Sequence, residues 1–321
     1  AWLADGQLQL RAGAGLVVLH LDGIGQREAW NLPLEGGQGL ADGVQHVHRQ
    51  AFAALGRQIG GTHAWCVGGK NAAEGAAALY AKMGSAVEAS GGSAANTIAG
   101  MASLGCTCGF IGQVANDQFG QVFAHDIRAI GVDFATPARE GEPPTAQCLI
   151  FVTPDGQRTM NTFLGAAQYL GEEALDRSMI ERAAILYLEG YLWNADESRD
   201  AMAEAIAVAR GAGRKVAFTL SDSFVIAGHG DTFRKMMADG DIDILFANEN
   251  EITALTGEDD FDAAVAKAAP LVPTLVVTRG PDGAIAIQNG SRCDVNAEPV
   301  SHVMDTTGAG DLFAAGFLAG Q

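Results

Sequence analysis

The residues of this chain best suited to chemistry form the stretch Asp305-Thr306-Thr307-Gly308-Ala309-Gly310-Asp311, which leads into an apolar run. Gly308, Ala309 and Gly310 have almost no side chain, so their backbone N–H groups can approach an anion closely at the start of a helix. The helix dipole favours an ionised Asp311, which can accept a hydrogen bond from an incoming hydroxyl. Donors for an anion beside an acceptor carboxylate suit phosphoryl transfer to an alcohol, although a short Gly-x-Gly-Asp string alone more often makes a turn and a helix cap.

A second glycine-rich stretch, Ser90-Gly91-Gly92-Ser93-Ala94-Ala95-Asn96-Thr97, predicts the opening of a helix that runs to about residue 104. The paired Gly91 and Gly92 let the backbone pass close to a ligand. Asn96, one turn into the helix, can donate to and accept from neighbouring hydroxyls. The alternative is a helix that packs tightly through its small residues.

Together these two stretches resemble the N- and C-terminal signatures of the PfkB family of carbohydrate and nucleoside kinases. The resemblance implies an α/β fold, the ribokinase-like three-layer α/β/α arrangement with a mostly parallel sheet and a small β lid. It also implies ATP and Mg²⁺, with Asp311 as the catalytic base and Gly308 to Gly310 as the cradle for the developing charge. Gly91, Gly92 and Asn96 would bind the acceptor.

The lid is expected at about residues 145–163, where two β-prone runs flank Thr153-Pro154-Asp155-Gly156-Gln157, a string of turn residues. Arg158 lies just beyond the turn. A guanidinium that moves in on closure would hold the transferring phosphoryl group, and the alternative is a solvated hairpin arginine.

After the lid, β-prone runs alternate with helical ones, which predicts a largely parallel sheet with ligands at the carboxyl ends of its strands. Asn248 and Glu251 directly follow the strand expected at 242–246 and share one face of a starting helix. They resemble the family's Asn-x-x-Glu element, which organises Mg²⁺ through its waters. A helix start with dipole-favoured acids is the alternative interpretation.

The nucleotide-binding residues are expected to include Thr278, Gly280 and Gly283, in the turn after the strand 275–278. The resemblance implies that this turn lines the phosphates or the ribose of the nucleotide, and that Thr307 also contacts the nucleotide. Asp305 is a candidate ligand for a monovalent cation, K⁺.

The bulk composition excludes several classes of partner. A net charge of −18, spread over short acidic groups, argues against nucleic acid or an anionic membrane. The longest uncharged run, 89–116, contains Ser, Asn, Thr and Gln among its glycines and is interpreted as buried loop, helix and strand. Five cysteines without Cys-x-x-Cys spacing indicate reduced thiols and a cytoplasmic protein. The protein is expected to be a monomer or a homodimer.

Residues 1–75 form an atypical N-terminal segment, and the kinase domain is expected to span 76–321. The segment holds 15 of the 42 glycines and none of the eight methionines. It is a divergent region, a flexible extension or a stretch outside the native reading frame, and the abrupt change near Gly75 favours the third. The family's acceptor-binding aspartate is not found there, Asp22 being only a stand-in. The resemblance also implies adenine-pocket residues beyond Gln321, so the C-terminus is taken as incomplete.

The acceptor is expected to be a nucleoside, with adenosine converted to AMP. Strings such as Tyr187-Leu188-Glu189-Gly190-Tyr191-Leu192-Trp193 resemble the bacterial adenosine-kinase-like branch. A sugar kinase of the ribose or fructose type and a non-catalytic nucleoside-binding protein remain open. A dinucleotide oxidoreductase is disfavoured because the third glycine and the ribose-binding acid of its fingerprint are missing.

Overall fold

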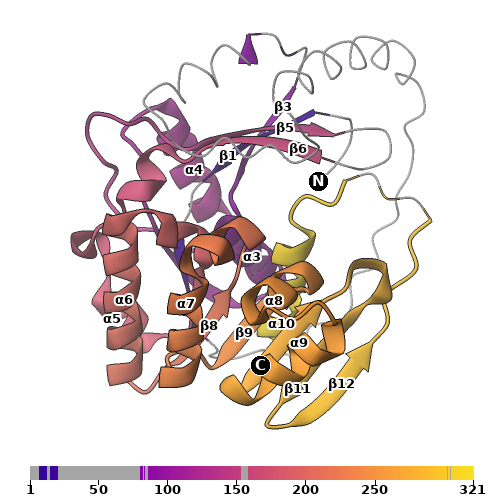
Figure 1. Ribbon diagram of the computed structural model, residues 1–321. Helices are drawn as coiled ribbons and strands as arrows, with labels where there is room; N and C mark the ends of the chain where they lie inside the picture. The colour runs from indigo at the N-terminus through magenta and orange to yellow at the C-terminus, as the bar shows by residue number, and fades with distance from the viewer. Residues whose placement is uncertain are drawn as a thin grey trace.

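The computed structural model describes residues 7–12, 15–20, 80, 81, 83, 86–152, 158–301, 303 and 305–321. Two β-sheets organise these residues, and Figure 1 shows the smaller one lying across one end of the larger. The expected ribokinase-like arrangement, a mostly parallel central sheet between helices with a small antiparallel lid, is confirmed.

The larger sheet has eight strands in the order β12-β11-β10-β9-β8-β7-β2-β4. Its four central strands run parallel, and β2 joins antiparallel to both β7 and β4. The strands are β2 (Gly15–His20), β4 (Thr107–Gly112), β7 (Ile185–Glu189), β8 (Lys215–Thr219), β9 (Ile244–Asn248), β10 (Thr274–Thr278), β11 (Ala284–Gln288) and β12 (Ser291–Val295).

The smaller sheet has the order β3-β1-β5-β6. Its strands are β1 (Gln7–Ala12), β3 (Val87–Gly91), β5 (Gln147–Val152) and β6 (Arg158–Phe163). The antiparallel pairing of β5 with β6 confirms the predicted hairpin. Both β1 and β2 come from the atypical N-terminal segment. Asp22 lies outside the described residues.

Helices cover both faces of the larger sheet, as Figure 1 shows with α6 to α9 in front and α3 and α10 behind. They are α3 (Ser93–Ser103), α4 (Gln118–Ala129), α5 (Arg177–Arg182), α6 (Asp196–Gly211), α7 (Ser223–Asp239), α8 (Glu249–Thr256), α9 (Phe261–Ala268) and α10 (Ala309–Ala319). Short 3₁₀ turns occur at η1 (Gly165–Tyr169), η2 (Glu172–Ala174), η3 (Gly190–Asn194), η4 (Ala269–Leu271) and η5 (Gly280–Asp282).

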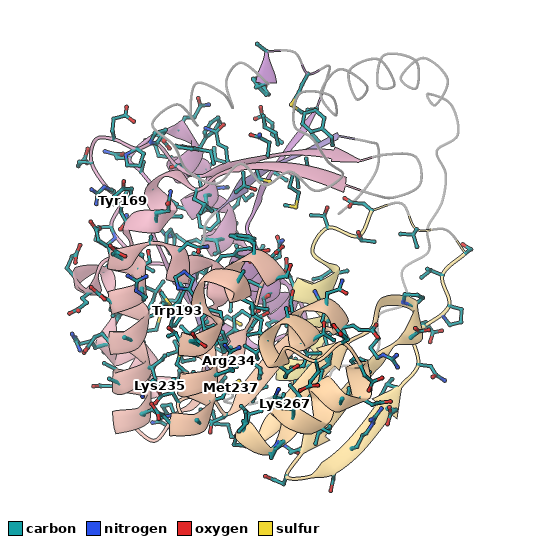
Figure 2. The ribbon with its side chains drawn as sticks, viewed as in Figure 1. Tyr169, Trp193, Arg234, Lys235, Met237 and Lys267 are labelled. Carbon is teal, nitrogen blue, oxygen red and sulfur yellow. The ribbon has the colours of Figure 1, made fainter. Side chains whose placement is uncertain are left out.

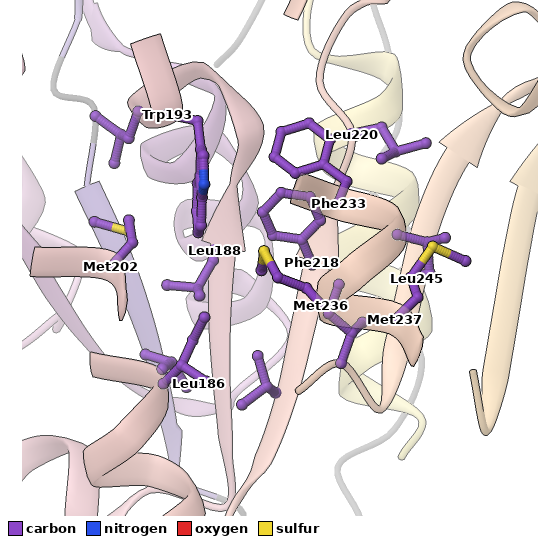
Figure 3. Close-up of a cluster of buried hydrophobic side chains, with 14 of the residues drawn as sticks. Leu186, Leu188, Trp193, Met202, Phe218, Leu220, Phe233, Met236, Met237 and Leu245 are labelled. Atoms are coloured by element: carbon purple, nitrogen blue, oxygen red, sulfur yellow. The ribbon is translucent and has the colours of Figure 1, made fainter. Parts of the chain in front are cut away.

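The alternation of side chains along each strand produces two separate cores. On β7, Leu186 and Leu188 face a cluster with Trp193, Phe218 and Phe233, which Figure 3 shows between the sheet and helices α6 and α7. The intervening strand residues face a second cluster built with α3, α4 and α10. Burial of both sheet faces explains why these strands read as continuous apolar runs in the sequence.

Charged side chains lie on the outer surfaces of the front helices. Figure 2 marks Lys235 on α7 and Lys267 on α9, well away from the smaller sheet, and they pair with Asp239 and Glu258. Within the described ranges, no helix combines the length and apolarity that a membrane span requires. The uncharged run 89–116 is divided among β3, α3 and β4, as expected.

Candidate active site

The glycine-rich turn before α10 presents an available backbone donor at the helix start. Gly308 caps the helix with φ 75°, a left-handed conformation that suits glycine. The Ala309 N–H donates to the Thr306 carbonyl at 3.2 Å, so this amide is partly engaged. The Gly310 N–H has no acceptor among the described residues, Gly310 is exposed, and a Cβ added there would meet open space. The Gly310 amide is therefore available as a donor and the Ala309 amide only in part, and the binding of an anion by this turn remains a prediction.

Asp311 and Asn96 meet although 215 positions separate them in the chain. The Asn96 Nδ2 donates to Asp311 Oδ2 at 2.8 Å. The approach is possible because α3 and α10 pack closely at Gly100, where an added Cβ would lie 2.9 Å from the Ala315 Cβ. The two signature stretches thus form one site, and the asparagine orients the carboxylate.

The carboxyl ends of four parallel strands bring further polar residues to the same edge of the sheet. Glu189 on β7 is in register with Thr219 on β8, and Asn248 on β9 with Thr278 on β10. The helix α8 begins at this edge, because Asn248 at the end of β9 is its N-cap. The start of α10 faces the same edge, because its Asp311 interacts electrostatically with Glu189 at the end of β7. Ligands of open parallel sheets bind at such an edge.

Asn248 and Glu251 form a reciprocal capping box, which was the alternative interpretation of their spacing. The backbone N–H and Nδ2 of Asn248 donate to the two carboxylate oxygens of Glu251 at 3.0 and 2.7 Å, and the Glu251 N–H donates to Asn248 Oδ1 at 2.9 Å. Burial raises the pKa of Glu251 to about 7. The pair orders the start of α8, and a role for Glu251 toward Mg²⁺ remains a prediction.

Thr278, Gly280 and Gly283 lie in the turn that joins β10 to β11, as expected. Gly280 and Gly283 both have positive φ, and a Cβ at Gly283 would lie 2.0 Å from the Val295 carbonyl oxygen. Beside them, the Arg279 guanidinium lies 4.3 Å from the centre of the Phe261 ring. This turn has a fixed shape next to Asn248.

The smaller sheet is attached to the site without an intervening loop. Gly91 ends β3, and Gly92, with φ 112° and ψ 145°, caps α3. Ser90 Oγ donates to Asp126 Oδ2 on α4 at 2.6 Å, which ties the small sheet to the large domain. Arg158 begins β6 opposite Val152, and the position of its side chain is not part of the described structure.

Asp305 and Thr307 interact with each other in the loop before α10. Asp305 Oδ1 accepts from the backbone N–H and the hydroxyl of Thr307 at 2.8 and 2.7 Å. No group of three or more His, Cys, Asp or Glu side chains in the described part of the chain could hold a metal ion.

Glu189 is the residue of this site that the sequence motifs do not indicate. Its side chain is 1% exposed at the end of β7. Ser93 and Ala94 at the start of α3 donate hydrogen bonds to it, while burial and the nearby Asp311 raise its pKa to about 8. One signal was available, because a lone acid closes the apolar run Ile185-Leu186-Tyr187-Leu188.

The fold and the meeting of the two glycine-rich stretches define the ribokinase-like class of α/β proteins. Residues 70–321 match the pfkB family of carbohydrate kinases, and the chain belongs to this family. The family match begins close to the composition change near Gly75.

Three relatives illustrate the similarity. The crystal structure of adenosine kinase from Sinorhizobium meliloti is 39% identical with a TM-score of 0.79, covering 99% of this chain and 88% of that one. The fructokinase of Klebsiella pneumoniae is 30% identical over 241 residues, 74% of this chain and 78% of its own length. An Escherichia coli structure of the ribokinase II type, in complex with ATP and Mg²⁺, is 25% identical with a TM-score of 0.64, covering 71% and 74%.

Proposed function

We propose that this chain is an ATP-dependent kinase that phosphorylates the 5′-hydroxyl of adenosine to give AMP. The observation that carries the proposal is the Asn96–Asp311 pair of 2.8 Å beside the Gly310 amide, which has no acceptor in the described part of the chain. A fixed carboxylate next to a backbone donor provides a proton acceptor for the alcohol and a donor for the phosphoryl oxygens.

In this mechanism Asp311 accepts the hydroxyl proton while the hydroxyl oxygen forms a bond to the γ-phosphorus. The bond from that phosphorus to the bridging oxygen breaks, and ADP leaves. Because the transition state is loose, positioning and charge stabilisation dominate over base strength. The Gly310 amide and Arg158 of the lid would face the transferring group, and Thr278, Gly280, Gly283 and Thr307 the nucleotide.

Mg²⁺, when bound with ATP, neutralises the phosphate oxygens and fixes their geometry. The Asn248–Glu251 pair would orient its water ligands, since both side chains lie at the strand edge. Asp305 is the candidate for a K⁺ ligand.

The adenosine kinase that matches 99% of this chain at 39% identity supports adenosine. A probable sugar kinase from Rhizobium etli matches the same share at 37% identity, so the preference for adenosine rests on the aromatic side chains near the site. Half-buried Tyr191 and Phe224, with ring centroids 6.3 Å apart, could present a stacking surface to a purine. Trp193 is excluded from this role because it is 2% exposed and packs against Phe218 and Phe233. The fructokinase match supports a sugar kinase as the second candidate.

The test is a panel of adenosine, inosine, ribose and fructose with ATP and Mg²⁺, assayed for phosphorylated product and ADP. AMP formation supports the proposal, and sugar phosphate identifies the second candidate. Tight adenosine binding without any product would favour a non-catalytic nucleoside-binding protein and overturn the proposed activity.

A further inference from the structure

Glu189 is a buried acid with an unsatisfied oxygen in the centre of the proposed active site. The side chain is 1% exposed, and its Oε1 has no hydrogen-bond partner among the described residues. An isolated buried carboxylate is very costly, whereas a neutral carboxylic acid with one unpaired oxygen costs far less. The site therefore favours the form of Glu189 that carries a proton.

The surroundings of Glu189 supply negative charge rather than a counter-charge. The negative charge of Asp311 on α10 raises the pKa of Glu189. The carboxylates of Asp311 and Glu189 also help to raise the hydroxyl pKa values of Tyr187 on β7 and Tyr191 in η3. Two further acids, Asp222 and Glu251, also raise the pKa of Tyr191, and no cation contributes to these shifts among the described residues. The donors from Ser93 and Ala94 favour the anion, but burial outweighs them.

We propose that Glu189 works as a neutral, protonated acid, and that its proton keeps a second negative charge away from Asp311 and the incoming phosphoryl group. When Glu189 loses this proton at alkaline pH, phosphoryl transfer is suppressed. This inference rests on the proposed kinase function. Glu189 is a positioning residue in this scheme, because it acts through the charge around Asp311 and does not itself exchange a proton with the substrate.

The direction of the pH effect follows from a pKa of about 8 for Glu189 in the folded protein. Below this pH Glu189 is neutral, so its side chain does not repel the negative charge of Asp311. Above it, an added negative charge opposes the approach of the polyanionic nucleotide in a low-dielectric site. We therefore expect kcat/KM to fall on an alkaline limb centred near pH 8.

The experiment compares pH–rate profiles from pH 6 to 9.5 for the wild type, Glu189→Gln and Glu197→Gln. Gln keeps the shape and remains neutral, so Glu189→Gln should retain kcat within about threefold at pH 7 and lose the alkaline limb. Glu197 is exposed at the start of α6, and its variant should keep the limb. An unchanged limb in Glu189→Gln, or a hundredfold loss of kcat at pH 7, would overturn the proposal.

A measurement without turnover separates this inference from the kinase proposal. The pKa of Glu189 is raised in the folded state above its ordinary 4.5, so its contribution to stability is complete below pH 4.5 and is lost as pH rises to about 8. The urea midpoint of Glu189→Gln should exceed that of the wild type by a margin that grows from pH 5 to 8 and then stays level. A constant margin contradicts a neutral Glu189, whatever the acceptor panel shows.

Should Glu189→Gln fail to fold, carboxyl ¹³C NMR of the wild type replaces it. A buried glutamate signal that titrates near pH 8 supports the proposal. Assignment separates this signal from that of Glu251, whose pKa is raised to about 7, and titration of the Glu189 signal below pH 6 overturns the proposal.

Discussion

The Nδ2 of Asn96 lies 2.8 Å from the Oδ2 of Asp311, and this contact joins α3 to α10, which lie far apart in the sequence. Asn96 belongs to α3 and Asp311 to α10. This hydrogen bond helps to orient the proposed base.

Replacing Asp311 with Asn should abolish phosphoryl transfer while leaving nucleotide binding intact. An amide cannot accept the hydroxyl proton, and a positioned base contributes about 10²- to 10⁴-fold to rate. Product assays measure phosphoryl transfer, and calorimetric titration with ATP measures nucleotide binding. Turnover within about tenfold of the wild type would show that Asp311 is not the base.

Replacing Asn96 with Ala should lower kcat/KM for the acceptor by about 10- to 150-fold, because a hydrogen bond to a charged group contributes about 1.5–3 kcal/mol. Ser103→Ala is the matched control on the same helix, since the Ser103 hydroxyl donates to the Gly100 carbonyl and to no other group among the described residues. Steady-state kinetics with both variants distinguish orientation of the base from a general effect on α3. Equal losses in the two variants would contradict the assigned role.

Two glycines of the same turn should respond differently to alanine. Gly308 has φ 75°, so Gly308→Ala is expected to cost roughly 1–2 kcal/mol of stability. Gly310 lies in regular helix with open space around it, so Gly310→Ala should fold normally but raise the KM for ATP, because a methyl group obstructs the approach of phosphate. Thermal melts and ATP titrations measure both effects. An unchanged KM in Gly310→Ala would place the phosphates elsewhere.

The close packing of α3 against α10 should be sensitive to volume at Gly100. A Cβ there meets the Ala315 Cβ at 2.9 Å and the Leu312 Cδ2 at 3.0 Å. Gly100→Val is therefore expected to destabilise the fold by about 1–3 kcal/mol and to reduce activity by separating Asn96 from Asp311. Gly316→Ala is the control on α10, where an added Cβ has no neighbour within 4 Å, and it should leave the melting temperature unchanged or higher. Urea melts with kinetics at low denaturant provide the comparison.

Much of the fold could be predicted because local signals agreed with one another. The runs at 145–152 and 158–163 contain β-formers around turn residues, and the structure has β5 and β6 there. The strand expected at 275–278 is also present, as β10. Such elements depend on nearby residues alone.

The site was predicted less completely, because its contacts depend on distant parts of the chain. Asn96 was predicted to bind the acceptor, but its bond to Asp311 requires the packing of α3 on α10, which no local pattern reveals. The role of Glu189 depends on burial by neighbouring elements, and burial cannot be assigned from one acid at the end of a strand. The spacing of Asn248 and Glu251 in the sequence fits both a helix cap and a pair that organises a metal ion. Only the side-chain geometry shows that both carboxylate oxygens of Glu251 accept hydrogen bonds from Asn248.

The direct passage from β3 into α3 leaves almost no slack between the covering sheet and the helix that carries Asn96. Gly91 and Gly92 are the whole of that joint. A change in the angle between β3 and α3 would therefore alter the backbone dihedrals of these two residues or shift α3, and with it the partner of Asp311.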